Sequence, residues 1–186
     1  MRTSLLACAV GAALIAGCGS MTELEGIYTI DSWTENTADC AAEGPSVLAS
    51  RGDTGFYIRE ESFFGKDFVN AVRCTDMAEC EMKASDSTIN FDGWAFDSGS
   101  DGGGWKGATT FAGTGGANGQ CTGTVDSYVM TSPASHAIRI ESQRRNAREF
   151  PPDSDGFCDT DAAVRAADGE PCIGLEVVTG TFVKGL

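Results

Sequence analysis

The sequence predicts an all-β fold of about eight antiparallel strands, with one short helix before the last strand. Glycine is abundant, at 24 of 186 residues, and long runs with helical periodicity are scarce. Several short segments alternate apolar and polar residues, which is the mark of a half-buried strand. Clusters of glycine, proline, asparagine and aspartate separate these segments and favour turns. Together these patterns indicate strands joined as hairpins.

Edge protection favours a barrel over an open sheet. An antiparallel sheet of this size must hide its edge strands, and closure removes the edges altogether. The first and last strands are then the natural partners. A β-sandwich is the alternative architecture. The length suits one domain, which we place at residues 26–186.

The sequence of the first part of the domain predicts three strands and one or two helical turns. The first strand covers residues 26–33, and residues 34–54 form a loop. The second and third strands lie at 56–59 and 67–73. Residues 75–83 could form one or two helical turns.

The middle of the domain predicts a hairpin over residues 89–112. Ile89 and Phe91 alternate with polar residues, whereas Trp94 and the next aromatic have the opposite parity. A bulge at Gly93 would account for this switch. Residues 97–104 are rich in glycine, serine and aspartate and predict the turn of this hairpin.

The last part of the domain predicts a second hairpin, a helix and a final strand. The hairpin pairs residues 121–130 with 136–143 and turns at Ser132-Pro133. The helix covers 159–167, where an aspartate can cap its start and a glycine can end it. The final strand covers 173–183.

The amino terminus resembles the export signal of bacterial lipoproteins. Arg2 precedes an apolar run at residues 5–16, which is too short to span a bilayer. The run closes with Ile15-Ala16-Gly17-Cys18, which is similar to a lipobox. The resemblance implies that residues 1–17 are removed, that Cys18 carries the lipid, and that residues 18–25 form a tether. Gly19 in place of aspartate implies sorting to the outer membrane.

Cysteine usage predicts disulfides in an oxidising compartment. Six cysteines remain in the domain, an even number that implies three bridges. They are Cys40, Cys74, Cys80, Cys121, Cys158 and Cys172. Sequence separation favours a Cys74–Cys80 closure and a Cys158–Cys172 closure, which would leave Cys40 to pair with Cys121. No CxxC spacing is present, so we expect neither a zinc site nor another cofactor.

The start of the domain is similar to that of lipocalin-like barrels. Those proteins begin with a Gly-x-Trp strand and carry a helix near the carboxyl terminus, and here Gly26-Ile27-Tyr28 takes the first place. The resemblance implies an eight-stranded barrel. If the barrel is open at one end, inward aromatic residues would line an apolar cup for a small ligand. The aromatic residues expected to line it are Tyr28, Phe91, Trp94, Trp105, Phe111 and Tyr128.

An acidic segment before the predicted helix is a candidate calcium site. Its carboxylates alternate around a glycine turn, and calcium binds six to eight oxygens. They are Asp153, Asp155, Asp159 and Asp161. The segment departs from the EF-hand pattern, because Pro151 and Ala162 stand where the first and closing carboxylates belong. A solvated turn followed by a helix cap is the alternative.

Charge and motif content narrow the function. A net charge of −14 disfavours nucleic acid as a partner. His136 is the sole histidine, and no nucleophile elbow is present, so we expect no enzyme. The prediction is a non-catalytic envelope lipoprotein that binds a small apolar ligand. The alternative is a structural or protein-interaction module with a filled core, which would contact another envelope protein.

Overall fold

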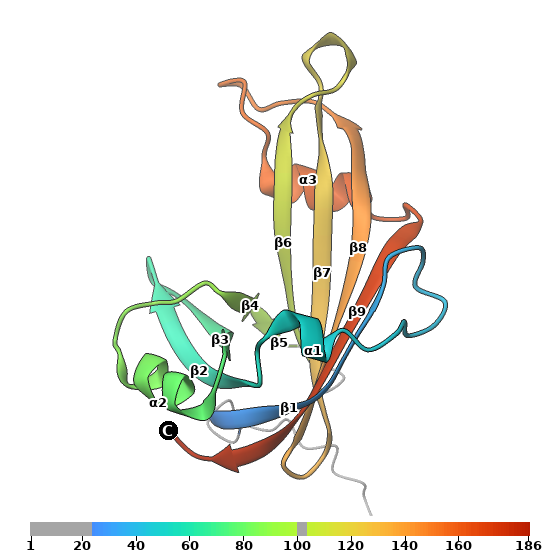
Figure 1. Cartoon of the computed structure of the whole chain (residues 1–186). Helices are drawn as coiled ribbons and strands as arrows, with labels where there is room; N and C mark the ends of the chain where they lie inside the picture. Colours follow the sequence, from blue (N-terminus) through green and yellow to red (C-terminus); the bar gives the residue numbers. More distant parts are fainter. Residues whose placement is uncertain (1–23, 100–103) are drawn as a thin grey trace, which may run out of the picture.

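The computed structural model describes residues 24–99 and 104–186 (Figure 1). The strands are β1 (Gly26–Asn36), β2 (Gly55–Phe63), β3 (Lys66–Cys74), β4 (Gly93–Phe96), β5 (Ser98–Gly99), β6 (Gly104–Thr114), β7 (Cys121–Ala134), β8 (Ala137–Phe150) and β9 (Cys172–Lys184). The helices are α1 (Leu48–Arg51), α2 (Met77–Ser85) and α3 (Thr160–Ala167), and a 3-10 turn covers Ala117–Gly119. The predicted signal, Cys18 and most of the tether lie outside the described residues.

The strands form one antiparallel sheet that is nearly closed into a barrel. The sheet order is β4-β3-β2-β1-β9-β8-β7-β6-β5. Consecutive strands therefore pair, except that β4 and β5 stand at opposite ends of the sheet, and β1 also pairs with β9. Asp97 alone separates β4 from β5, and its backbone N–H donates to the carbonyl of Lys106 at 3.0 Å. This bond joins the two ends of the sheet. The predicted barrel is confirmed, as is the short helix before the last strand.

Two local predictions about turns are wrong. The 89–112 hairpin is largely absent, because Trp94 pairs with Ala71 of β3 and β6 pairs chiefly with β7. The second hairpin is longer than predicted and turns at Ser135–His136, whereas Pro133 lies within β7 beside a register shift. His136 has a φ of 65° in this turn, so it does not begin the strand.

The barrel interior is packed at the end where β1 begins. Tyr28 stacks on Phe56 with ring centroids 5.2 Å apart. Trp33, Phe96 and Met130 are fully buried in the same cluster. Burial of apolar surface stabilises the folded state by about 25 cal/mol per Å², so this cluster contributes strongly to the stability of the barrel.

Strands β6, β7 and β8 extend past the other end of the barrel (Figure 1). The pairing of β8 with β9 stops at Cys172, while β7 continues to pair as far as Phe150 of β8. Helix α3 covers one face of this extension, where its Ala163 and Ala167 pack beside Val125. The barrel therefore has one packed end and a raised wall at the other.

Two of the three predicted disulfide pairings are wrong. The structure joins Cys40 to Cys172, Cys121 to Cys158, and Cys74 to Cys80, so only the last follows the prediction. Since α3 lies across β7, the segment before it brings Cys158 over the start of that strand. Cys172 then begins β9 beside the end of β1, where the loop that carries Cys40 leaves the sheet.

Candidate functional site

A cleft of about 500 Å³ opens where the barrel ends and the β6–β8 extension begins. Its lining comes from the end of β1, the starts of β4 and β9, and the middle of β6, β7 and β8. Arg51 of α1 and Arg73 near the end of β3 complete it. Typical small-molecule sites measure roughly 300–1,000 Å³, so the cleft has the size of a ligand site.

Aromatic side chains form one wall of the cleft. Trp94 and Tyr128 are almost fully buried, and Phe111 on the extension is 65% exposed. The hydroxyls of Tyr128 and Thr109 lie 3.1 Å apart. Burial raises the pKa of Tyr128, which keeps its hydroxyl protonated.

Three arginines line the cleft, and each is paired with carboxylates. Arg144 makes a bidentate contact with Asp126, at 2.7 and 2.9 Å. Arg51 donates to Glu35 at 2.9 Å. Arg73 pairs with Asp92 across the rim. Charges on the cleft wall are therefore compensated, and bidentate pairing holds Arg144 in one orientation.

The Arg73 guanidinium has an unused donor. Its Nε is buried and has no hydrogen-bond partner among the described residues. A buried donor without a partner costs free energy.

Glu176 is a carboxyl of the cleft whose pKa is shifted by its surroundings. The indole Nε1 of Trp33 donates to it at 2.7 Å, and the Arg51 guanidinium lies 3.5 Å away. The same guanidinium stacks over the Trp33 ring at 5.0 Å. Burial raises the pKa of Glu176, and the Trp33 bond and the Arg51 charge offset part of this rise.

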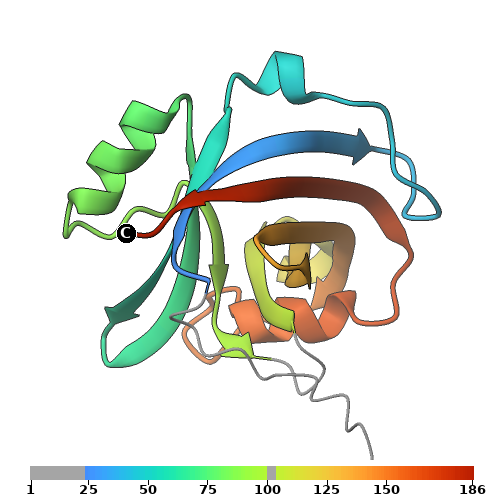
Figure 2. The ribbon, with the colours of Figure 1, turned by 90° about the horizontal axis from the view of Figure 1, so that it is seen from below.

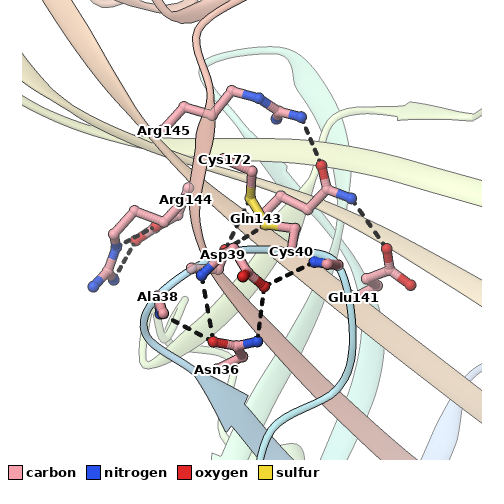
Figure 3. Close-up of a disulfide and its surroundings, with 12 residues drawn as sticks. Asn36, Ala38, Asp39, Cys40, Glu141, Gln143, Arg144, Arg145 and Cys172 are labelled. Atoms are coloured by element: carbon pink, nitrogen blue, oxygen red, sulfur yellow. Dashed lines mark hydrogen bonds and ion pairs between the residues drawn. A yellow bond between two sulfur atoms is a disulfide. The ribbon is translucent and has the colours of Figure 1, made fainter.

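A disulfide fixes the loop at the cleft rim. Figure 3 shows Cys40 bonded to Cys172, with the Asn36 side chain at the centre of the loop. The Asn36 amide oxygen accepts from the backbone N–H of Ala38 at 3.0 Å, and its nitrogen donates to Asp39 at 3.0 Å. Asn36 itself lines the cleft, so the loop shapes this side of the opening.

Three of the six predicted aromatic residues line the cleft, and three do not. Trp94, Phe111 and Tyr128 lie in its wall. Tyr28 belongs to the packed interior, and Trp105 packs against the same cluster. Phe91 stands on the outside of the barrel and is 62% exposed. Strand parity does not give the height of Tyr28 or Trp105 along the barrel, and Phe91 lies in the loop before β4, where parity does not apply.

Sequence reasoning missed the charged residues of the cleft. Arg144 was not among the residues predicted to line a ligand site, although it lines the cleft. Glu176 carried a usable signal, because it is a lone carboxylate inside the apolar last strand.

The acidic segment at 153–161 forms a turn and a helix cap. The Asp153 carboxylate accepts from the N–H of Asp155 and of Phe157. Asp159 caps α3 by accepting from the Ala162 N–H at 2.7 Å. In the part of the chain that the structure describes, no three potential metal ligands converge. The Asp153 and Asp159 carboxylates therefore serve this turn and this cap, and the calcium hypothesis for Asp153, Asp155, Asp159 and Asp161 stays a prediction.

Comparisons with known proteins give no relative. No protein-family model matches the chain, and neither the curated proteins nor the solved structures return a significant match. Among the described residues, every helix is too short or too polar to cross a membrane.

Proposed function

We propose that this chain is a non-catalytic lipoprotein of the cell envelope, held at the outer membrane by a lipid on Cys18. The lipobox-like run before Cys18 and the glycine after it support this proposal. The three disulfides also support it, because such bonds persist in oxidising compartments and are rare in the cytosol.

The cleft supports ligand binding as the role of the domain. Its aromatic wall suits a flat or apolar group packed against Trp94 and Tyr128. Its arginines and carboxylates suit polar groups at the other end of the same molecule. A wholly apolar ligand would displace water from these ion pairs without replacing its hydrogen bonds, which is costly. We therefore propose a small amphipathic ligand in place of the apolar one expected from sequence.

The packed interior supports a second function. Around Trp33, Phe56 and Phe96 the barrel is filled, as expected for a structural or protein-interaction module. Such a module would need no occupant in the cleft. Measurement of a bound molecule therefore separates the two functions.

Native mass spectrometry of the membrane-extracted protein tests the ligand proposal. The wild-type chain should carry a small co-purified molecule. A Thr109→Trp substitution places a large side chain on an exposed residue of the cleft wall and should abolish this added mass. Ala108→Trp is the matched control, because Ala108 is exposed on the next position of the same strand and does not line the cleft. Absence of a bound molecule from the wild type would favour the structural function.

The lipid is tested separately on the same preparation. The mass of the amino-terminal peptide should include a thioether-linked lipid on Cys18. A Cys18→Ser substitution should release the protein from envelope fractions. Unchanged fractionation of that variant would contradict the anchor and leave the cleft result intact.

A further inference from the structure

Four phenylalanines form an exposed patch on the outside of the barrel. The phenylalanine patch consists of Phe63 and Phe64 at the end of β2, Phe68 of β3, and Phe91 of the loop before β4. Phe64 is 92% exposed and Phe63 is 46% exposed. Ring centroids lie 4.3 Å apart for Phe63 and Phe64, 6.0 Å for Phe63 and Phe91, and 6.3 Å for Phe68 and Phe91. Contiguous exposed apolar groups of this kind mark interaction sites.

The turn that presents the patch is a poor place for phenylalanine on folding grounds. Phe64 and Gly65 connect β2 to β3 with φ angles of 49° and 75°. Two-residue hairpin turns with both φ values positive favour asparagine or aspartate followed by glycine. A bulky residue in this conformation is unfavourable, and such outliers gather at functional positions. Folding therefore does not account for Phe64.

A buried polar network holds the patch in place. The Asn70 side chain donates to Glu61 at 3.0 Å and to the carbonyl of Asn90. Arg59 donates to the same Glu61 carboxylate and to the carbonyl of Asp86 at 2.6 Å. These bonds fasten the loop that carries Phe91 onto the hairpin, so the patch is formed before any partner arrives.

The patch lies at the end of the barrel where the tether enters. The Glu60 N–H donates to the Glu25 carboxylate at 3.0 Å, and Phe63 is three residues further along β2, or about 10 Å. Cys18 precedes Glu25 by seven positions, so a lipid on Cys18 would be attached within about 25 Å of Glu25. The hairpin projects from the barrel wall at the left of Figure 1 and the lower left of Figure 2.

The cleft opens at the opposite end of the same strand pair. Gly55 begins β2 and pairs with Cys74, next to the cleft residue Arg73, whereas Phe63 ends β2 and pairs with Lys66. The two ends are separated by the length of β2, roughly 27 Å. A membrane at the patch would leave the cleft open to the aqueous side.

We propose that the phenylalanine patch inserts into the surface of the membrane that carries the lipid anchor. This inference rests on the proposed lipidation of Cys18, since the short tether keeps the patch within reach of the lipid. Glu60 and Asp67 border the patch against one cation, Lys66, so an anionic surface would repel it. The partner is therefore a lipid surface without net charge.

Fluorescence quenching in vesicles tests the insertion. The full lipidated chain is reconstituted into phosphatidylcholine vesicles, with Phe64→Trp as the reporter and brominated acyl chains as the quencher. Phe157→Trp is the matched control, because Phe157 is 72% exposed and lies beside Cys158, at the far end of the extension. The native tryptophans contribute equally to both variants. If the side chain inserts 5–10 Å into the interface, quenching should be about threefold stronger for Phe64→Trp than for Phe157→Trp.

Each other outcome overturns the insertion and separates it from the anchor. Equal quenching in variants that sediment with the vesicles means that the anchor holds and the patch stays in water. Failure of the wild type to sediment means that the anchor is absent, and insertion fails with it. A Phe64→Trp emission shift that depends on protein concentration without vesicles means that the patch is a contact between two copies of this chain.

Discussion

Replacing Cys40 and Cys172 by alanine should strongly destabilise the domain. Their disulfide closes a sequence separation of 132 residues. In the chain-entropy model, a cross-link over that separation stabilises the fold by about 5 kcal/mol. The Cys158–Cys172 pairing favoured by sequence closes a much shorter loop and would contribute about 3 kcal/mol. Both cysteines are only half-buried, so their replacement removes little packing.

Urea unfolding measures this change, with Cys18→Ser as the background that keeps the protein in solution. The free energy of unfolding should fall, and the dependence on urea should steepen, because the unfolded chain expands when the long loop opens. The control is Cys74→Ala with Cys80→Ala, whose disulfide spans a separation of 6. That bond contributes about 2 kcal/mol by the same model, and its loss should leave the urea dependence nearly unchanged.

Two results would refute the reasoning. A loss below about 2 kcal/mol with an unchanged urea dependence would contradict the long-loop entropy. A peptide map of the unreduced protein that links Cys40 to Cys121 would contradict the pairing itself.

The structure predicts the direction of the change in stability or pKa for three further perturbations. Gly107→Ala should destabilise the barrel by about 1–3 kcal/mol in thermal unfolding, because the added Cβ would clash with a carbonyl oxygen of β4 where the barrel closes. Gly113→Ala is the control on the same strand, because its Cβ would face open space and leave stability unchanged. Burial raises the pKa of Glu176, so the folded state binds more protons than the unfolded state. The free energy of unfolding therefore falls as pH rises from the ordinary glutamate pKa to the raised one. Glu176→Gln should flatten this fall when urea midpoints are measured against pH. Hydrogen bonds from the side chain and backbone of Thr75 lower the pKa of Glu79 to about 2. The stability that these bonds contribute is present above the ordinary pKa of 4.5 and is lost as pH falls through about 2. Thr75→Val should raise this pKa in a carboxyl NMR titration, and an unchanged value would contradict the assignment.

Local chemistry was enough to predict the strands, the last helix and one disulfide. In the predicted strand at 136–143, Ile138 and Ile140 alternate with polar residues, which favours one core-facing side, and both isoleucines are buried. Asp159 or Asp161 was expected to cap the last helix, and the Asp159 carboxylate does so. Cys74 and Cys80 are close enough in the chain to meet whatever the rest of the fold does. These features depend on neighbours within a few residues, which the amino-acid order specifies directly.

Only the tertiary structure decided the long-range disulfides, the cleft and the patch. Strand parity tells which face a side chain occupies, but register and stagger decide how far along the barrel it lies. Tyr28 and Tyr128 therefore look alike in sequence and share the core cluster, yet only Tyr128 also lines the cleft. The pairing of Cys40 with Cys172 likewise depends on the β1–β9 contact, which joins residues at opposite ends of the chain.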